Sequence, residues 1–193
     1  MSIIVAVRKK DLAIIGSDTQ FDHGGLIVSA KYKKNHQKIH KFKDAYLGIT
    51  GTAAHHNVIE SVIRKYHSKI CLDNVESIFE TFLWLQPKLK DEYFLNTDED
   101  EDQEYASNQL HILIVNPNGL FGVDSYREVM EYSCFWAIGS GDEYALGALH
   151  AVYDRVDDPK LIAKAALSAA GEFDEHSGQP FLYHSVKLKN AGR

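Results

Sequence analysis

The residue with the most direct chemical potential is the second of the chain. Ser2 follows Met1, and methionine aminopeptidases remove an initiator methionine when the next residue is small. The α-amine left behind has a pKa of about 7.7–8.0, so part of it is neutral at physiological pH. Such an amine can act as the base for the hydroxyl of its own residue. Ser2 is therefore a candidate nucleophile, although Met-Ser also begins many proteins without such chemistry.

Several familiar catalytic motifs are missing from the sequence. It contains no Gly-x-x-x-x-Gly-Lys-Ser/Thr phosphate loop, no Gly-x-Ser-x-Gly elbow and no His-Glu-x-x-His zinc motif. His55 and His56 are adjacent rather than four residues apart, so their rings point apart at a helix start. We therefore expect a surface pair rather than a metal site. A nearby basic cluster indicates a solvated strand or a basic patch: His36, Lys38, His40 and Lys41.

Strands are predicted around these candidates by apolar runs. Residues 3–7 and 12–16 form two such runs, joined by a polar turn, and predict a hairpin buried on both faces. A basic region of alternating character follows over residues 30–42. Further strands are expected over residues 46–50, 111–115, 120–123, 128–132, 134–138 and 181–188.

Apolar residues at helical spacing predict two pairs of helices. The first pair covers residues 58–66 and 78–85, ends before Pro87, and has Asp73 or Asn74 as the N-cap of its second helix. The second pair covers residues 142–153 and 159–171. The order of strands, helix pair, strands, helix pair and strand predicts an α+β fold with helices covering antiparallel sheets. We expect one domain over residues 1–193.

Composition excludes several classes of protein. The chain has 193 residues, 45% of them apolar and 25% charged, which is typical of a globular protein. The net charge of −6 argues against a general nucleic-acid binder. No apolar run approaches the ~18 residues of a membrane span, and the N-terminus lacks the basic region of a secretory signal. Cys71 and Cys134 lack metal-binding spacing and predict reduced packing residues of a cytoplasmic protein.

The segment from Asp98 to Glu104 contains six acids in seven residues. It lacks the glycine and the ligand spacing of an EF-hand, so a calcium loop is not expected. A run of like charges is typical of a solvated loop.

Five parts of the chain, taken in order, carry a shared pattern. They are Ser2 to Val7 with Gly16-Ser17-Asp18, Gln37 to Phe42, Ile49 to Ala54, Ala137 to Gly141, and Asp174 to Gly178. This pattern resembles that of the proteasome-type peptidases, the N-terminal-nucleophile (Ntn) hydrolases that include proteasome β subunits and bacterial HslV. The resemblance runs from Ser2 to about Val186. It implies a four-layer αββα sandwich of two antiparallel sheets flanked by helix pairs.

The resemblance also implies a role for each matching residue. Ser2 would attack a peptide carbonyl and form an acyl-enzyme, and a charged Lys38 would assist its deprotonation. Asp18 would hold Lys38 by a charge-assisted hydrogen bond, and the backbone N–H of Gly51 would meet the oxyanion. Three residues would orient the amine and its water: Ser140, Asp174 and Ser177.

Assembly and ligands follow from the same resemblance. It implies a homo-oligomeric ring in the cytoplasm that acts on peptides or unfolded proteins, with no required cofactor. A structural sodium ion could bind carbonyl groups after the last helix, where the matching positions are Gly171, Asp174 and Ser177. The sequence does not specify an ATP-dependent unfoldase partner, the ring size or the substrate.

The chain departs from the family pattern in three places. Its nucleophile is serine, which lacks the methyl group that restricts the threonine rotamer. The stretch between Asp18 and Lys38 is several residues longer than in HslV, and the acidic segment has no counterpart. Two alternatives remain open: an Ntn hydrolase of small amides, and a non-catalytic ring or scaffold subunit with the same fold. Only the catalytic alternatives require the removal of Met1.

Overall fold

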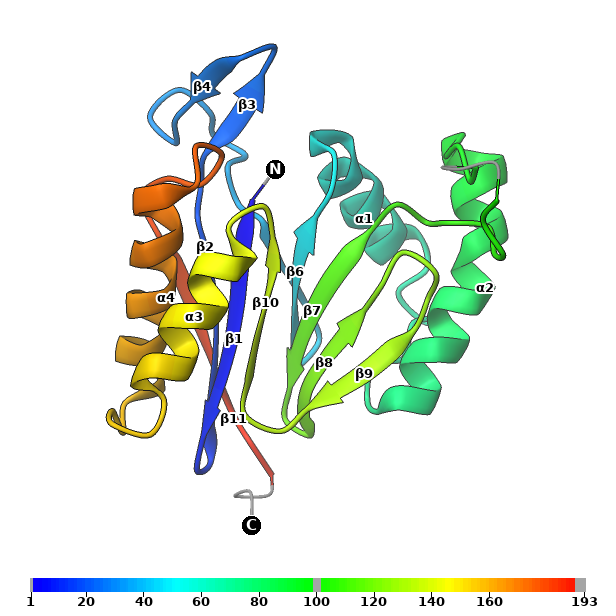
Figure 1. Cartoon of the computed structure of the whole chain (residues 1–193). Coiled ribbons are helices and arrows are strands. Elements are labelled where there is room, and N and C mark those ends of the chain that lie inside the picture. The colour runs from blue at the N-terminus through cyan, green and yellow to red at the C-terminus, as the bar shows by residue number, and fades with distance from the viewer. Residues whose placement is uncertain (1, 99–101, 190–193) are drawn as a thin grey trace.

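The computed structural model describes residues 2–98 and 102–189, so Met1 and part of the acidic segment lie outside the described residues. Figure 1 shows two sheets packed face to face, each with a helix pair on its outer side. The four-stranded sheet has the order β10-β1-β2-β11. Its strands are β1 (Ile3–Lys9), β2 (Leu12–Ser17), β10 (Phe135–Gly139) and β11 (Leu182–Lys187).

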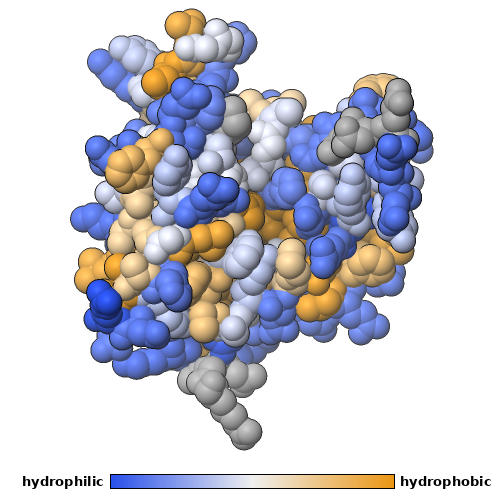
Figure 2. All heavy atoms as spheres, viewed as in Figure 1, coloured by the Kyte–Doolittle hydropathy of each residue, from blue (hydrophilic) through white to orange (hydrophobic). Residues whose placement is uncertain are grey.

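The second sheet has five strands in the order β5-β6-β7-β8-β9, all paired antiparallel. They are β5 (Ile39–Phe42), β6 (Ala45–Thr50), β7 (His111–Asn116), β8 (Gly119–Val123) and β9 (Val129–Tyr132). A separate small hairpin of β3 (Phe21–His23) and β4 (Leu26–Val28) projects beyond the sheets (Figure 1). Hydrophobic side chains are exposed at its tip (Figure 2).

Helices α1 (Ala53–Lys65) and α2 (Val75–Tyr93) pack on the five-stranded sheet. Helices α3 (Asp142–Val152) and α4 (Pro159–Phe173) pack on the four-stranded sheet. The layer order is therefore αββα, and the expected fold is confirmed.

Strand β1 shows why its sequence is apolar without alternation. Ile3, Val5 and Val7 face α3 and α4, whereas Ile4 and Ala6 face the opposite sheet. Successive side chains of a strand point to opposite faces, so a strand between two layers must be apolar on both. The same arrangement holds Ser2, immediately before β1, at the junction of the two sheets.

Two sequence expectations need correction. The basic region over residues 30–42 is a strand only at Ile39–Phe42, whereas residues 30–38 form turns and irregular backbone. Helix α2 does not end before Pro87 but continues to Tyr93. Burial of Leu85 and Leu89 on the same face explains this continuation, since packing outweighs the backbone hydrogen bond that proline cannot donate. Asn74 is the N-cap of α2 and accepts a hydrogen bond from Ser77 N–H at 2.9 Å.

The cysteines and the helices test two further expectations from the sequence. Neither cysteine forms a disulfide, and Cys71 is exposed rather than a packing residue. Within residues 2–98 and 102–189, no helix combines the length and apolar character needed to cross a bilayer.

Candidate active site

A buried ion pair lies at the centre of the site. Lys38 Nζ is 2.8 Å from Oδ1 and 2.9 Å from Oδ2 of Asp18, and both side chains are fully buried. Asp18 directly follows β2, and Lys38 directly precedes β5. The carboxylate also accepts hydrogen bonds from the backbone N–H groups of Ile3 (3.1 Å), Gln20 (3.1 Å) and Gly178 (3.2 Å). Both charges therefore have partners, as buried charges require.

Burial shifts both groups toward their neutral forms. Desolvation lowers the pKa of Lys38 below its ordinary value, although the Asp18 carboxylate acts in the opposite direction. Desolvation likewise raises the pKa of Asp18, against the effect of Lys38. The Lys38 ammonium therefore gives up its proton more readily than a solvent-exposed lysine does.

The backbone around Ser2 is fixed on both sides. The Ser2 side chain is buried, and its carbonyl accepts a hydrogen bond from Ser140 N–H at 2.9 Å. A side chain on Gly139 would collide with that carbonyl, and Gly139 has a φ of +115°. On the other side, Asp18 Oδ1 binds Ile3 N–H, and Asp18 N–H donates to Ile3 O at 3.2 Å. The carboxylate that holds Lys38 is thus bound to the residue after Ser2.

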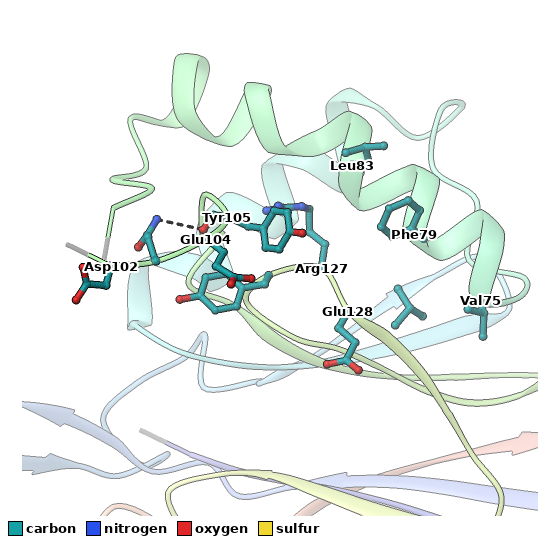
Figure 3. A pocket seen from close by; sticks show the side chains of 11 residues that line it. Val75, Phe79, Leu83, Asp102, Glu104, Tyr105, Arg127 and Glu128 are labelled. Atoms are coloured by element: carbon teal, nitrogen blue, oxygen red, sulfur yellow. Dashed lines mark hydrogen bonds between the residues drawn. The ribbon is translucent and has the colours of Figure 1, made fainter. Parts of the chain in front are cut away.

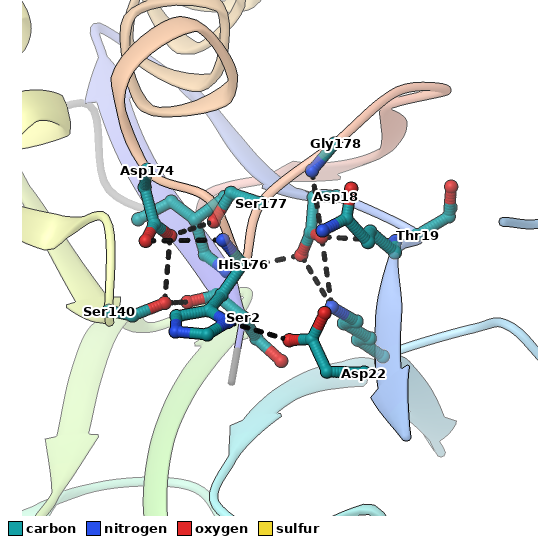
Figure 4. A network of polar contacts seen from close by, with 12 residues as sticks. Ser2, Asp18, Thr19, Asp22, Ser140, Asp174, His176, Ser177 and Gly178 are labelled. Atoms are coloured by element: carbon teal, nitrogen blue, oxygen red, sulfur yellow. Dashed lines mark hydrogen bonds and ion pairs between the residues drawn. The ribbon is translucent and has the colours of Figure 1, made fainter. Parts of the chain in front are cut away.

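A second polar group surrounds Asp174, the C-cap residue of α4. Its Oδ2 accepts hydrogen bonds from Ser140 Oγ at 2.7 Å and from Ser177 Oγ at 2.5 Å. Ser140 Oγ also lies 3.4 Å from Ser2 O. Figure 4 shows Ser2 between this group and Asp18. The structure therefore brings Ser140, Asp174 and Ser177 together beside the candidate nucleophile.

Gly51 stands at the end of β6, where the oxyanion donor was expected. Its φ is +129°, and a Cβ there would lie 2.6 Å from His55 Nδ1 and 3.0 Å from Gln109 O. Glycine is therefore needed at this position. The neighbouring Thr50 methyl would lie 3.2 Å from a Cβ on Gly139. This end of β6 thus reaches the segment that abuts Ser2.

A cavity of about 360 Å³ opens beside this junction. It runs between the ends of the two sheets, from Thr50 and Gly139 to Tyr132 and Trp136. The two aromatic rings are stacked, with centroids 4.8 Å apart. An apolar side chain could be accommodated there.

The expectation that His55 and His56 form a surface pair is wrong. Both are buried, and they belong to the inward stripe of α1 that includes Ile59 and Val62. His55 Nδ1 accepts a hydrogen bond from Thr52 N–H at 3.2 Å. The stripe was visible in the sequence, because these residues recur at helical spacing.

The basic cluster is solvated only in part, because Lys41 is exposed and His36 half-buried whereas the other two residues are buried. Lys38 is fully buried, and His40 is 8% exposed. His40 Nε2 lies 3.0 Å from Nδ1 of His56, whose ring packs edge-on against Phe21. The described residues contain no group of three or more His, Cys, Asp or Glu side chains suited to a metal ion.

Sequence reasoning missed the residues that join the segment after Asp18 to the Asp174 loop. His176 Nδ1 lies 2.9 Å from Asp22 Oδ2, and Gln20 Nε2 donates to Glu175 O at 2.7 Å. Only the fold brings these positions together, since Asp22 and His176 are 154 residues apart. These two contacts hold the start of β3 against the loop that carries Ser177.

The three positions proposed for sodium lie at the C-terminal end of α4. Gly171 is in its last turn, Asp174 is its C-cap, and Ser177 lies in the following turn. Gly171 is thus inside the helix rather than after it. Sodium binding at these carbonyls stays a prediction.

The chain is similar to known proteins over almost its whole length. A family model described as "Proteasome subunit" matches residues 2–182. The structure of Thiobacillus denitrificans BPH has a TM-score of 0.91 and 35% identity, covering 97% of this chain and 98% of that one. Its complex with epoxomicin gives 0.90 and 36%, covering 97% and 99%. Eukaryotic HslV from Trypanosoma brucei gives 0.67 and 19%, covering 96% and 99%, and is similar in fold. No curated protein sequence matches the chain.

Proposed function

Because the chain belongs to the proteasome subunit family, we propose that it is an endopeptidase whose nucleophile is Ser2, exposed by removal of Met1, and that it works in a homo-oligomeric ring. One observation carries this proposal: the buried Lys38–Asp18 pair is hydrogen-bonded to the residue that follows Ser2. A buried ion pair contributes little net stability compared with apolar packing. Its place beside a candidate nucleophile is better explained by chemistry.

The first half of the reaction forms an ester. The free α-amine of Ser2 takes the proton of Oγ, through a water, as Oγ bonds to the peptide carbonyl carbon. The Lys38 ammonium stabilises the developing negative charge on Oγ, and the N–H of Gly51 binds the carbonyl oxygen as it becomes an oxyanion. The tetrahedral intermediate then collapses. The C–N bond breaks, and the leaving amine receives the proton held by the Ser2 amine.

The second half hydrolyses that ester. A water gives a proton to the Ser2 amine while its oxygen attacks the acyl carbon. Collapse of this intermediate returns the proton to Ser2 Oγ and releases a carboxylic acid. The hydroxyls of Ser140 and Ser177, both bound to Asp174, orient the amine and water.

Peptides are the proposed substrates. The relative from Thiobacillus denitrificans was solved in complex with epoxomicin, and we propose that the same ligand binds beside Ser2. The cavity between Gly139 and Trp136 offers room for one substrate side chain. A cytoplasmic location suits this activity.

The test combines labelling and hydrolysis. Purified protein is incubated with epoxomicin, its intact mass is measured, and hydrolysis of short peptide amides is followed in parallel. We expect loss of Met1, a mass increase of one inhibitor per chain, and peptide hydrolysis. Ser2→Ala should abolish both reactions, whereas Ser68→Ala, at an exposed serine far from the site, should keep them.

The remaining outcomes identify the alternatives. Retention of Met1 without labelling would favour a scaffold subunit. Hydrolysis of small amides without hydrolysis of peptides would favour a small-amide hydrolase.

A further inference from the structure

The small hairpin has an apolar tip that no other described part of the chain covers. Its strands β3 and β4 are only three residues long and form a sheet of their own. A two-stranded hairpin is marginally stable alone. Leu26 is 68% exposed, Ile27 65%, and Tyr32, in the turns that follow, 77%. Apolar side chains clustered in this way mark a contact surface.

The same segment is strongly basic. Residues 24–34 contain three lysines and no acid. Lys33 packs over the Phe21 ring, 3.0 Å from its centroid, whereas Lys31 and Lys34 are exposed. We call residues 21–34 the basic hairpin. Its partner should combine an apolar floor with negative charge.

A groove of that kind lies along α2. Its volume is about 1320 Å³. Its apolar side is formed by half-exposed residues of α2: Val75, Phe79 and Leu83. Its acidic rim is formed by exposed residues of the loops opposite: Asp102, Glu104 and Glu128. Figure 3 shows the two sets facing one space, which we call the acidic groove.

We propose that the basic hairpin of one copy docks into the acidic groove of the next copy. The hairpin projects from the half with the four-stranded sheet, whereas α2 lies on the outer face of the other half (Figure 1). A chain therefore cannot fill its own groove. Such a head-to-tail contact closes into a ring when its rotation divides the circle. This inference names the interface of the ring in the proposed function and rests on that function for the closed assembly.

Docking also reaches the candidate active site. The hairpin begins three residues after Asp18, and Asp22 binds His176 in the loop that carries Ser177. A neighbour that holds the hairpin therefore fixes one wall beside Ser2. The groove of an adjacent copy would thus act on the site indirectly, by holding this hairpin in place.

Charge reversal tests this interface. One variant carries K31E and K34E, a second carries E104K and E128K, and a third carries all four changes. The first two place like charges across the contact, so we expect each to raise the concentration at which half of the assembly dissociates by about tenfold or more. The third restores opposite charges with exchanged signs and should assemble like the wild type. Light scattering and sedimentation velocity at low salt measure the assembled mass.

Controls keep the outcome decisive. The variant K69E/K164E changes exposed lysines elsewhere and should assemble normally, and circular dichroism should show all variants folded. Assembly unaffected by either reversal would overturn the proposal and leave the groove for a basic segment of another protein. Failure of the fourfold variant to assemble better than both double variants would also overturn it. Epoxomicin labelling of assembled wild type tests Ser2 separately, so a ring with this interface but no labelling would refute only the proposed peptidase chemistry of Ser2.

Discussion

The ammonium nitrogen of Lys38 lies 2.8 Å from Oδ1 of Asp18, although the two residues are twenty positions apart and neither side chain touches solvent. Strand β2 ends immediately before Asp18, and β5 of the opposite sheet begins immediately after Lys38. The pair thus joins the two sheets at the edge where Ser2 immediately precedes β1. The Asp18 carboxylate is stabilised by backbone N–H groups as well as by the Lys38 ammonium.

Replacing Lys38 by methionine should abolish peptide hydrolysis. The ammonium is expected to stabilise charge on Ser2 Oγ, and removal of one such group typically lowers kcat by about a hundredfold or more. The single change leaves Asp18 buried without its cation, so it should also lower the free energy of unfolding by about 3–5 kcal/mol. Activity on peptide amides and urea unfolding measure the two effects.

A double variant separates folding from chemistry. Lys38→Met with Asp18→Asn removes both charges, so it should regain much of the lost stability and remain inactive. Recovery of activity along with stability would mean that Lys38 has only a structural role.

Ser2→Thr should retain hydrolysis, within about tenfold of the wild-type rate. Threonine keeps the hydroxyl, and its methyl restricts the side-chain rotamer. The measurement is kcat and KM on one peptide amide for both forms after the loss of Met1 is verified by mass. A folded, processed threonine variant without activity would contradict the proposed nucleophile chemistry.

His56 should make stability depend on pH. Burial, assisted by nearby His40 and Lys38, lowers its pKa to about 3. The unfolded chain binds this proton below about pH 6.5, and the folded chain does so only near pH 3. The free energy of unfolding should therefore fall as pH decreases through this window, by about 1.4 kcal/mol for each unit of pKa difference. Urea unfolding between pH 7 and 4 measures the slope.

The matched variant for this slope is His56→Gln, which keeps a hydrogen-bonding side chain but does not titrate. It should flatten the dependence, whereas His150→Gln, at an exposed position of α3, should not. Equal slopes in the wild type and His56→Gln would show that this burial does not govern acid stability.

Much of the fold could be predicted from local patterns. The apolar runs of β1 and β2 and the two helix pairs follow from periodicity, because each element faces a packed layer. The motif around Ser140 and the motif around Asp174 could be placed by resemblance, and the structure brings them together at hydrogen-bonding distance. Their catalytic roles stay predictions.

The remainder depends on contacts between distant parts of the chain. The hairpin of β3 and β4 lies in the stretch between Asp18 and Lys38, which is longer than in HslV, and it is held partly by the contact of Asp22 with His176. Burial of Lys38 could not be inferred from a basic run that resembles a solvated strand. Helix α2 passes through Pro87 because of tertiary packing, which overrides a local stop signal.

Peptide hydrolysis should require a free α-amine on Ser2. With Met1 or any residue before it, the Ser2 nitrogen is an amide, which cannot accept a proton, and the hydroxyl then lacks its base. The test uses a removable N-terminal tag whose cleavage leaves Ser2 as the first residue. One preparation is assayed before and after cleavage, and intact mass verifies each state. We expect hydrolysis only after cleavage, and equal rates in the two states would rule out the N-terminal-nucleophile mechanism.

The pH profile of the processed form provides the second half of this prediction. The amine must be neutral to act as a base, so kcat/KM should rise through about pH 7.7–8.0 as the amine loses its proton. Lys38 must remain charged, so the rate should fall at higher pH when its ammonium deprotonates. Because burial lowers the pKa of Lys38, the alkaline fall should begin below the ordinary lysine range. A rate that kept rising through pH 10.5 would show that the Lys38 charge is not required. A bell-shaped profile in the processed form, without a similar profile in the tagged form, would assign the rise at low pH to deprotonation of the Ser2 amine.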